Sequence, residues 1–281
     1  MNDPVSNAID HIRSRCPQGT ADGGFHVTLN FHPDLIVAGS TVIDRLASDG
    51  VYRSQFETGT SNGGLTAFRD GDRWNWESRI FGGAYDNAAP SLRPKYGSLN
   101  HLHDPAGGSR RFGSAHFRLR PHVRTRISFS YPDSFLNPQN FAVGDASHLV
   151  ALANANQLSL DPWLDNYIEA HIHGPLVIDR DIEALVLDPS FRGSRLEEKA
   201  QTLGCEIEWH AGFRLPVHQS KECQKYRGPD AADAIVHLAE NGYITPARLS
   251  QARETELDYQ TAKWVWHCMA RFGYQQPSDG D

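Results

Sequence analysis

Strand-like segments come first in this chain and helical segments come last. Runs in which apolar and polar residues alternate, the period of a β-strand, recur up to about residue 215. Beyond residue 190 helical patterns predominate, and one strand pattern at 205–210 interrupts them. Strands gathered in one part of a chain and helices in another are typical of an α+β fold. We therefore predict an α+β protein whose core is two packed, mostly antiparallel sheets. This split β-sheet core should surround a cleft, with an N-terminal helix and a helical C-terminal region.

The ends of most segments are marked by Pro or Gly, which terminate regular structure. A weakly patterned stretch at 65–110, rich in Gly, Arg and Trp, is expected to be a loop system. The strands that we expect are 25–31, 51–56, 115–119, 126–131, 167–174 and 205–210. The helices that we expect are within 1–20 and at 40–49, 144–157, 194–202, 229–241 and 247–272, and 181–187 fits either type.

The length of 281 residues allows one large domain with a small appendage. Hydrophobic residues make up 39% of the chain and charged residues 22%, as in ordinary globular proteins. We predict a helical lead over 1–22, a domain that carries the site over 23–215, and a helical region over 216–281.

Charge and apolar content limit the partners that we expect. The net charge of -7 argues against a dedicated nucleic-acid binder. No apolar run reaches the roughly 18 residues of a membrane helix, and the start does not have the pattern of a secretory signal. The four cysteines are scattered, which indicates reduced thiols. We therefore expect a cytoplasmic protein without membrane contact, although delivery into another cell by a secretion system would leave the same sequence.

Polar residues recur on single faces of three predicted strands. Side chains alternate across a strand, so residues two positions apart point the same way. Arg53 shares a face with Gln55 on the first of these strands. The faces of the other two strands carry Ser128 and Ser130 on one, and Tyr167, Glu169, His171 and His173 on the other. Brought together, the three faces would supply an arginine, two hydroxyls and a carboxylate among imidazoles.

This set of groups suits cleavage of a nicotinamide–ribose bond. That reaction passes through a cationic sugar, which a carboxylate such as that of Glu169 can stabilise. The planar fork of an arginine fits a pyrophosphate. The loop at 58–64 is rich in Gly, Ser and Thr, and could offer backbone amides to phosphate groups.

Three short motifs resemble those of ADP-ribosyltransferases. They are Val-Tyr-Arg at 51–53, Ser-Phe-Ser at 128–130, and a late strand with Glu169. The family has Thr between the two serines and Glu/Gln-x-Glu in the last motif. In this chain Phe129 stands where the family has Thr. The last motif corresponds either to Tyr167-x-Glu169 or to Glu169-x-His171.

The resemblance implies a glycosyltransferase reaction in which NAD is the substrate, Glu169, Arg53 and Ser128 are catalytic, and no metal is needed. The residues that it implies for NAD binding are His26, Tyr52, Arg53, Thr58, Gly59, Ser61, Ser130, Tyr167 and His171. The acceptor of the ADP-ribose is left open among a protein, a nucleic acid, a small molecule and water. The resemblance also implies that the protein is a bacterial toxin or effector. Blocks such as 31–34 and 167–174 also resemble a bacterial protein family of unknown function, which implies nothing about activity.

Two other interpretations remain open at this point. The pairs His101/His103 and His171/His173 could each chelate a metal from one strand face, with His26, His32 and Asp34 completing a hydrolase site. A non-catalytic interaction protein on a degenerate transferase fold would instead use its C-terminal helices for docking.

Overall fold

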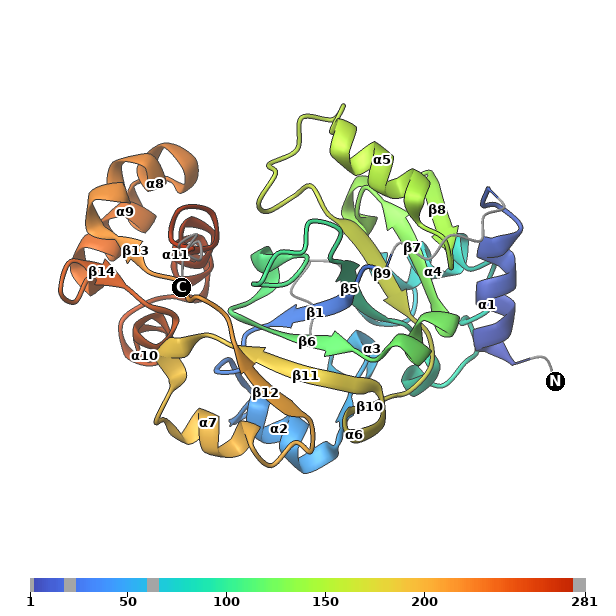
Figure 1. The fold of residues 1–281 in the computed structure, drawn as a ribbon, viewed down its shortest axis with the longest axis horizontal. Helices are drawn as coiled ribbons and strands as arrows, with labels where there is room; N and C mark the ends of the chain where they lie inside the picture. Colours follow the sequence, from blue (N-terminus) through green and yellow to red (C-terminus); the bar gives the residue numbers. More distant parts are fainter. Residues whose placement is uncertain (1–2, 18–23, 60–65, 275–281) are drawn as a thin grey trace.

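The computed structural model describes residues 3–17, 24–59 and 66–274. Eight strands form the main sheet, in the order β12-β11-β6-β1-β5-β9-β7-β8, and only the β11–β12 pair is parallel. Helices cover the sheet at both ends of the chain (Figure 1). The α+β class, the mostly antiparallel pairing and the terminal helices are therefore confirmed.

The main-sheet strands are β1 (Val27–Phe31), β5 (Lys95–Leu99), β6 (Ala115–Leu119), β7 (Ile127–Tyr131), β8 (Asn140–Val143), β9 (Ile168–Ile172), β11 (Ile182–Leu187) and β12 (Glu206–Trp209). Three two-stranded ribbons pair β2 (Ile36–Val37) with β3 (Ser40–Thr41), β4 (Val51–Tyr52) with β10 (Leu176–Val177), and β13 (Leu215–Pro216) with β14 (Tyr243–Ile244). The α-helices are α1 (Pro4–Arg13), α2 (Val42–Asp49), α3 (Gln55–Thr58), α4 (Asp72–Ile80), α5 (Ser147–Ala155), α6 (Ile178–Asp181), α7 (Arg195–Ala200), α8 (Ser220–Arg227), α9 (Pro229–Leu238), α10 (Pro246–Thr255) and α11 (Tyr259–Phe272). Two short 3-10 helices, η2 (Arg110–Phe112) and η4 (Ser134–Leu136), matter for the site.

The main sheet is split between β1 and β5. These strands pair only through Val27 with Leu99 and Thr28 with Ser98, so the last three residues of β1 and the first three of β5 do not pair with each other. All eight strands nevertheless belong to one hydrogen-bonded sheet, which differs from the two packed sheets that we expected. The split lies inside this single sheet and leaves room for a cavity.

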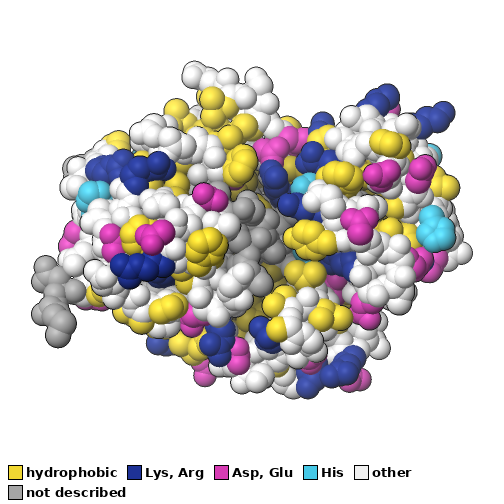
Figure 2. Space-filling view, turned by 180° about the vertical axis from the view of Figure 1, so that it is seen from behind, with side chains coloured by type: hydrophobic (Ala, Val, Ile, Leu, Met, Phe, Trp, Pro, Cys, Tyr) yellow, Lys and Arg dark blue, Asp and Glu magenta, His cyan; other side chains and the backbone are white. Residues whose placement is uncertain are grey.

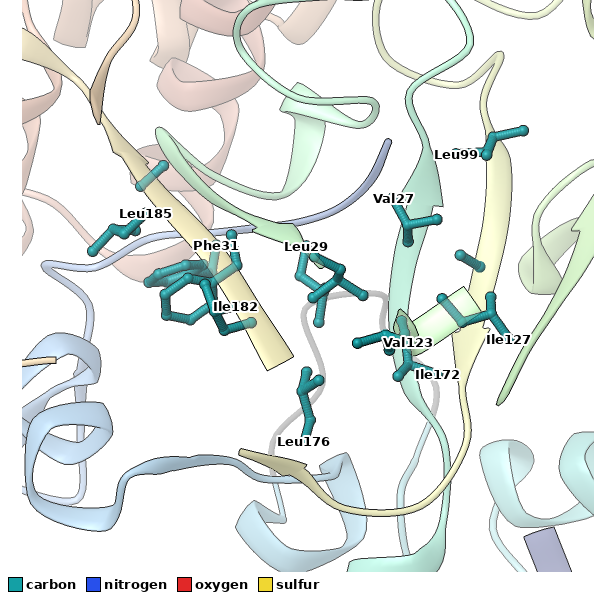
Figure 3. Packing of buried hydrophobic residues seen from close by; sticks show 14 of the residues in the cluster. Val27, Leu29, Phe31, Leu99, Val123, Ile127, Ile172, Leu176, Ile182 and Leu185 are labelled. Carbon is teal, nitrogen blue, oxygen red and sulfur yellow. The ribbon is translucent and has the colours of Figure 1, made fainter. Parts of the chain in front are cut away.

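The main hydrophobic core lies against one face of the sheet. Alternate residues of β1 and β9, such as Leu29, Phe31 and Ile172, point into it and are almost completely buried. Figure 3 shows these side chains in one cluster with Leu176 from β10 and Ile182 from β11. The opposite residues of β9 therefore point away from this core, and they include Glu169 and His171.

Two smaller clusters pack beside the main core. One joins helices α8 to α11 around Trp266 and Met269. The other joins α1 and α4 around Trp76, Phe81 and Tyr85. This second cluster covers the polar face of β9, because Trp76 and Phe81 lie against the ring of His171.

The expected strand at 51–56 is wrong in its second half. Strand β4 ends at Tyr52 and pairs with β10 outside the main sheet. Ser54 then begins helix α3 through a capping box, in which its side chain accepts from the amide of Glu57 and the Glu57 carboxylate accepts from the amide of Ser54. Arg53 therefore lies between a strand and a helix, and does not share a strand face with Gln55.

The expected helix at 247–272 is two helices. Asp258 accepts from the amides of Gln260 and Thr261, which begins α11 after α10 has ended at Thr255. Within the described residues, none of the helices combines the length and the apolar character that crossing a bilayer requires.

Candidate active site

A cavity of about 740 Å³ opens where β1 and β5 separate. Asn30 and Phe31 line it from the end of β1, and Lys95, Tyr96 and Gly97 line it from the start of β5. The volume falls in the range of small-molecule sites in proteins. The unpaired part of the sheet thus becomes the wall of a ligand-sized space.

Glu169 is a buried carboxylate in the wall of this cavity. It lies on β9 and is 5% exposed. Ser134 Oγ donates to its Oε2 at 2.9 Å, and His171 Nε2 lies 3.1 Å from its Oε1. Burial alone would raise the pKa of Glu169, but the hydrogen bond and charge of His171, together with Arg73 and Ser134, hold the pKa below its ordinary value. The carboxylate is therefore ionised near neutral pH although it is buried.

A chain of hydrogen bonds runs from Glu169 into the protein. His171 Nδ1 lies 3.0 Å from Ser128 Oγ, which lies 2.9 Å from His173 Nε2. His173 Nδ1 lies 2.7 Å from the hydroxyl of Tyr85. Ser128, Tyr85 and both imidazoles are fully buried, so the chain ends inside the molecule.

The first hydrogen bond of this chain has a fixed direction. Glu169, being ionised, only accepts, so His171 Nε2 donates to it. Ser128 Oγ lies between His171 Nδ1 and His173 Nε2, and the hydroxyl of Tyr85 lies beside His173 Nδ1. Burial, assisted by the charge of neighbouring groups, holds the pKa of His173 well below its usual range, which agrees with a neutral ring. The hydrogen bond from His171, supported by the buried groups behind it, therefore fixes the position of the carboxylate.

A second carboxylate faces the same cavity. Asp133 follows the end of β7 and accepts from the hydroxyl of Tyr167 at 2.6 Å. Burial and the nearby charge of Glu169 raise the pKa of Asp133, whereas the pKa of Glu169 is lowered. Two carboxyl groups whose environments shift their pKa values in opposite directions are a common arrangement in acid–base sites.

Arg73 completes the wall beside Glu169. Its Nη1 donates to Ser134 Oγ at 2.9 Å, and its guanidinium lies 4.0 Å from the centre of the Tyr96 ring. The hydroxyl of Tyr96 donates to Glu77 at 2.7 Å, and Glu77 is fully buried. Arg93 donates to the same carboxylate at 2.5 Å. Helix α4 thus supplies a buried ionic cluster that holds Arg73 and Tyr96 in place.

Arg53 lines the same cavity but is held very differently. Its side chain is 45% exposed, and its Nε donates to Asp49 at 2.7 Å. Glu57 lies 3.9 Å from its Nη1. The hydrogen bond with Asp49 raises the pKa of Arg53. The structure therefore brings Arg53 to the cavity that contains Glu169. The positive charge of Arg53 is already shared by two carboxylates that are close to it in the sequence.

Some of the residues expected to bind NAD line the cavity and others lie behind its wall. Tyr52, Thr58 and Tyr167 line the cavity beside Arg53 and Glu169. Ser130 and His171 lie behind the wall, together with the proposed catalytic Ser128, and are fully buried. We expected these residues to contact the ligand directly. Side chains at the surface of the cavity cover them, so they support the wall instead.

Two of the expected binding elements lie elsewhere or are otherwise engaged. The amides of Thr58 and Gly59 donate to Ser54 O and Gln55 O within α3, so this part of the expected phosphate loop is a helix end. His26 is exposed before β1, at the end of that strand opposite Phe31. Ser61 lies outside the described residues.

The four histidines of the metal interpretation do not come together. Lys95 pairs with Ile172 and Leu99 pairs with Ile168, so His101 and His103 follow the end of β5 that lies farthest from His173. Within residues 3–17, 24–59 and 66–274, no group of three or more His, Cys, Asp or Glu side chains is placed to hold a metal ion. Asp34 instead pairs with Arg253 at 2.8 Å.

Several cavity residues were not found from the sequence. Asp133 and Ser134 follow the strand that carries Ser128, and the Pro-Asp-Ser turn at 132–134 was the signal that could have indicated them. The others that sequence reasoning missed are Arg73, Tyr96, Arg111 and Lys263. They come from helices and from an unexpected strand, so no short motif joins them.

The protein has an α+β fold with a mostly antiparallel sheet, and two neighbouring strands of this sheet separate around a cavity. The buried, ionised carboxylate in the wall of this cavity makes it a candidate catalytic site. The chain belongs to the family described as "Protein of unknown function (DUF3626)", whose family model matches residues 26–155 and 145–272. It is also similar to the Gene 2 protein of Mycobacterium phage D29, at 29% identity over 190 residues, or 59% of this chain and 68% of the phage protein. The second matched range of the family includes both Glu169 and the C-terminal helices.

Proposed function

We propose that the protein cleaves the nicotinamide–ribose bond of NAD and transfers ADP-ribose to an acceptor. The observation that carries this proposal is Glu169, a buried and ionised carboxylate in the wall of a cavity that also receives Arg53. A fixed anion in a site of low dielectric stabilises a developing cation more strongly than water does. The nicotinamide–ribose bond is suited to such a site because its cleavage leaves a cationic sugar.

The reaction needs only groups that the cavity provides. The bond between ribose C1′ and the pyridinium nitrogen breaks, and its electron pair leaves with neutral nicotinamide. Glu169 stabilises the positive charge that forms at the sugar. The acceptor then bonds to C1′ and releases a proton, which Asp133 is placed to accept when it is ionised. The chain through His171 and Ser128 positions Glu169 and does not touch the substrate.

Charge inside the cavity favours an anionic ligand. Among the described residues, four arginines and two lysines line it against three carboxylates, in a protein whose net charge is -7. On the face shown in Figure 2, by contrast, basic and acidic side chains are interspersed. Positive potential in a concave site of an acidic protein attracts a diphosphate.

Unused hydrogen-bonding groups also support a polar ligand. Within the described part of the chain, Arg73 Nε and Gln55 Oε1 are buried without a hydrogen-bond partner, and both residues line the cavity. Buried polar atoms normally have partners, because an unpaired one costs free energy. A nucleotide in the cavity would supply them, and the rings of Tyr96 and Tyr167 offer surfaces for a base or nicotinamide.

All four cysteines are free thiols, which fits our expectation of a reducing, cytoplasmic site of action in the producing cell or in a recipient cell. The acceptor is not specified by the cavity, because water, a small molecule or a side chain would each bond to the same carbon.

Incubation of the pure protein with NAD, with and without a chelator, tests the proposal. We expect release of nicotinamide, measured by mass spectrometry, that the chelator does not reduce. Absence of NAD binding and of nicotinamide release would contradict the proposal. NAD binding without release, unchanged in Glu169→Gln, would instead favour a non-catalytic interaction protein.

A further inference from the structure

A second, smaller cavity of about 280 Å³ adjoins the first. The two cavities share lining residues, among them Arg111, Phe112 and Lys263. Helices α10 and α11 form the far wall of the smaller cavity. The C-terminal helical region therefore closes part of the space that contains Glu169.

One face of α11 is directed toward this space. Tyr259, Lys263 and His267 follow one another at intervals of four residues, Trp266 lies three residues after Lys263, and all four line the smaller cavity. The opposite side of the helix packs into the hydrophobic cluster around Met269. Packing of the apolar side thus fixes which polar side chains face the cavity.

Lys263 is a partly buried cation without a counterion. Within the described residues, its ammonium group has no hydrogen bond or ion pair, and it lines both cavities. Burial and the positive charges of Arg111 and Arg227 lower the pKa of Lys263. The fold therefore gathers like charges around an unpaired lysine, which is unfavourable unless an anion binds there.

His267 gives an independent sign of a missing ligand. It is 5% exposed, and its Nδ1 has no hydrogen-bond partner among the described residues. Burial, with the positive charges of Arg227 and Arg111, lowers the pKa of His267 to about 3, so its ring is neutral. One turn from Lys263, a neutral imidazole with a free nitrogen can donate to a phosphate oxygen.

Arg111 connects this region to Glu169. Its backbone oxygen accepts from Trp266 Nε1 at 2.8 Å, and its side chain pairs with Asp165. The next residue, Phe112, places its ring 5.6 Å from that of Tyr167, two residues before Glu169 on β9. A diphosphate beside Arg111 and a ribose beside Glu169 would thus occupy adjoining parts of one space.

We propose that Arg111 and Lys263, with His267 beside them, form a phosphate-binding subsite for the diphosphate of the nucleotide whose ribose lies at Glu169. This inference rests on the proposed function. It moves the diphosphate from Arg53, where the sequence motif placed it, to η2 and α11. The helical C-terminal region is then part of the substrate site.

Calorimetric titration with inorganic pyrophosphate tests the subsite without any catalytic step. We expect saturable binding that Lys263→Met weakens about tenfold, since a hydrogen bond to a charged group would be lost. Lys221→Met is the matched control, because Lys221 is exposed on α8 and lies outside both cavities. The control should bind pyrophosphate as the wild type does.

Stability separates binding from a structural role. Lys263→Met removes an unpaired, partly desolvated charge, so we expect its urea midpoint to equal or exceed that of the wild type. Pyrophosphate should also compete with NAD. Unchanged pyrophosphate affinity in Lys263→Met, or binding that does not compete with NAD, would overturn the subsite.

The failure of one proposal can be told from the failure of the other. Lys263-dependent pyrophosphate binding in a protein that does not cleave NAD would support the subsite and refute the proposed reaction. Cleavage of NAD with an unchanged KM in Lys263→Met would support the reaction and refute the subsite.

Discussion

The two residues that first indicated a site, Glu169 and Arg53, lie in opposite kinds of surroundings. Glu169 is buried on an interior strand of the sheet, and besides its strand neighbour His171 it depends on Ser134 and Arg73, which the fold brings from 35 and 96 residues away. Arg53 is half exposed, and its partners Asp49 and Glu57 are each four residues away in the chain. The Glu169 wall is therefore built by tertiary structure, and the Arg53 wall by local ion pairs.

This difference indicates where chemistry is concentrated. A buried charge requires several precisely placed partners, whereas an exposed ion pair contributes little to stability and is easily replaced. We therefore expect the Glu169 wall to govern the reaction and the Arg53 wall to adjust binding. The following four predictions, from the largest effect to the smallest, test that contrast.

Glu169→Gln should have the largest effect. The amide keeps the shape of the side chain but removes the charge that stabilises the sugar cation, so we expect nicotinamide release to fall by roughly 10³-fold. NAD affinity should change by less than about threefold. Glu206→Gln, an exposed strand glutamate outside the cavity, is the control and should keep full activity. An active Glu169→Gln variant would remove the carboxylate from the mechanism.

Ser128→Ala should destabilise the protein without directly touching the ligand. The substitution leaves His171 Nδ1 and His173 Nε2 without their shared hydroxyl, and we expect a loss of about 2 kcal/mol in the free energy of unfolding. Urea denaturation measures this change. Ser147→Ala on the exposed face of α5 should stay within about 0.5 kcal/mol of the wild type. An equal response of the two variants would show that the buried chain does not hold the wall.

His173 should make stability depend on pH. Its folded pKa is lowered, so below about pH 6.5 the unfolded chain binds a proton that the folded chain does not. Stability is therefore present above that pH and is lost as the pH falls. His173→Asn should reduce the slope of unfolding free energy against pH by about 1.4 kcal/mol per pH unit below pH 6.5.

Denaturation at several pH values between 4 and 8 gives this slope. The control is His218→Asn at an exposed position, whose slope is expected to match that of the wild type. A slope in His173→Asn equal to that of the wild type would mean that the ring is protonated in the folded protein.

Arg53→Gln should have the smallest effect. Because Asp49 and Glu57 already share its charge, we expect KM for NAD to rise by less than about fivefold with kcat unchanged. Steady-state kinetics of nicotinamide release checks this. A loss of kcat comparable to that of Glu169→Gln would reverse the contrast between the two walls.

Local patterns in the sequence predicted the parts of the site that lie within single strands. Alternation placed Glu169, His171 and His173 on one side of the chain along and just after β9, and Ser128, the shared partner of the two histidines, lies on the neighbouring strand. The same rule failed for Arg53, because the capping box of Ser54 and Glu57 turned the second half of the expected strand into a helix.

The rest of the site depends on tertiary structure. Arg73 reaches Glu169 from α4 through Ser134, and Lys263 reaches the cavity from α11, 94 residues after Glu169 in the chain. The split between β1 and β5 follows from where pairing stops, which no pattern within either strand specifies. Composition and alternation were therefore enough for the α+β class but not for the cavity.

A structure of the protein with a non-hydrolysable NAD analogue would test the central claim most directly. The account predicts a ribose hydroxyl within about 3.2 Å of the Glu169 carboxylate and the diphosphate beside Arg111 and Lys263. An analogue bound away from Glu169, or a cavity that stays empty of it at saturating concentration, would contradict the account.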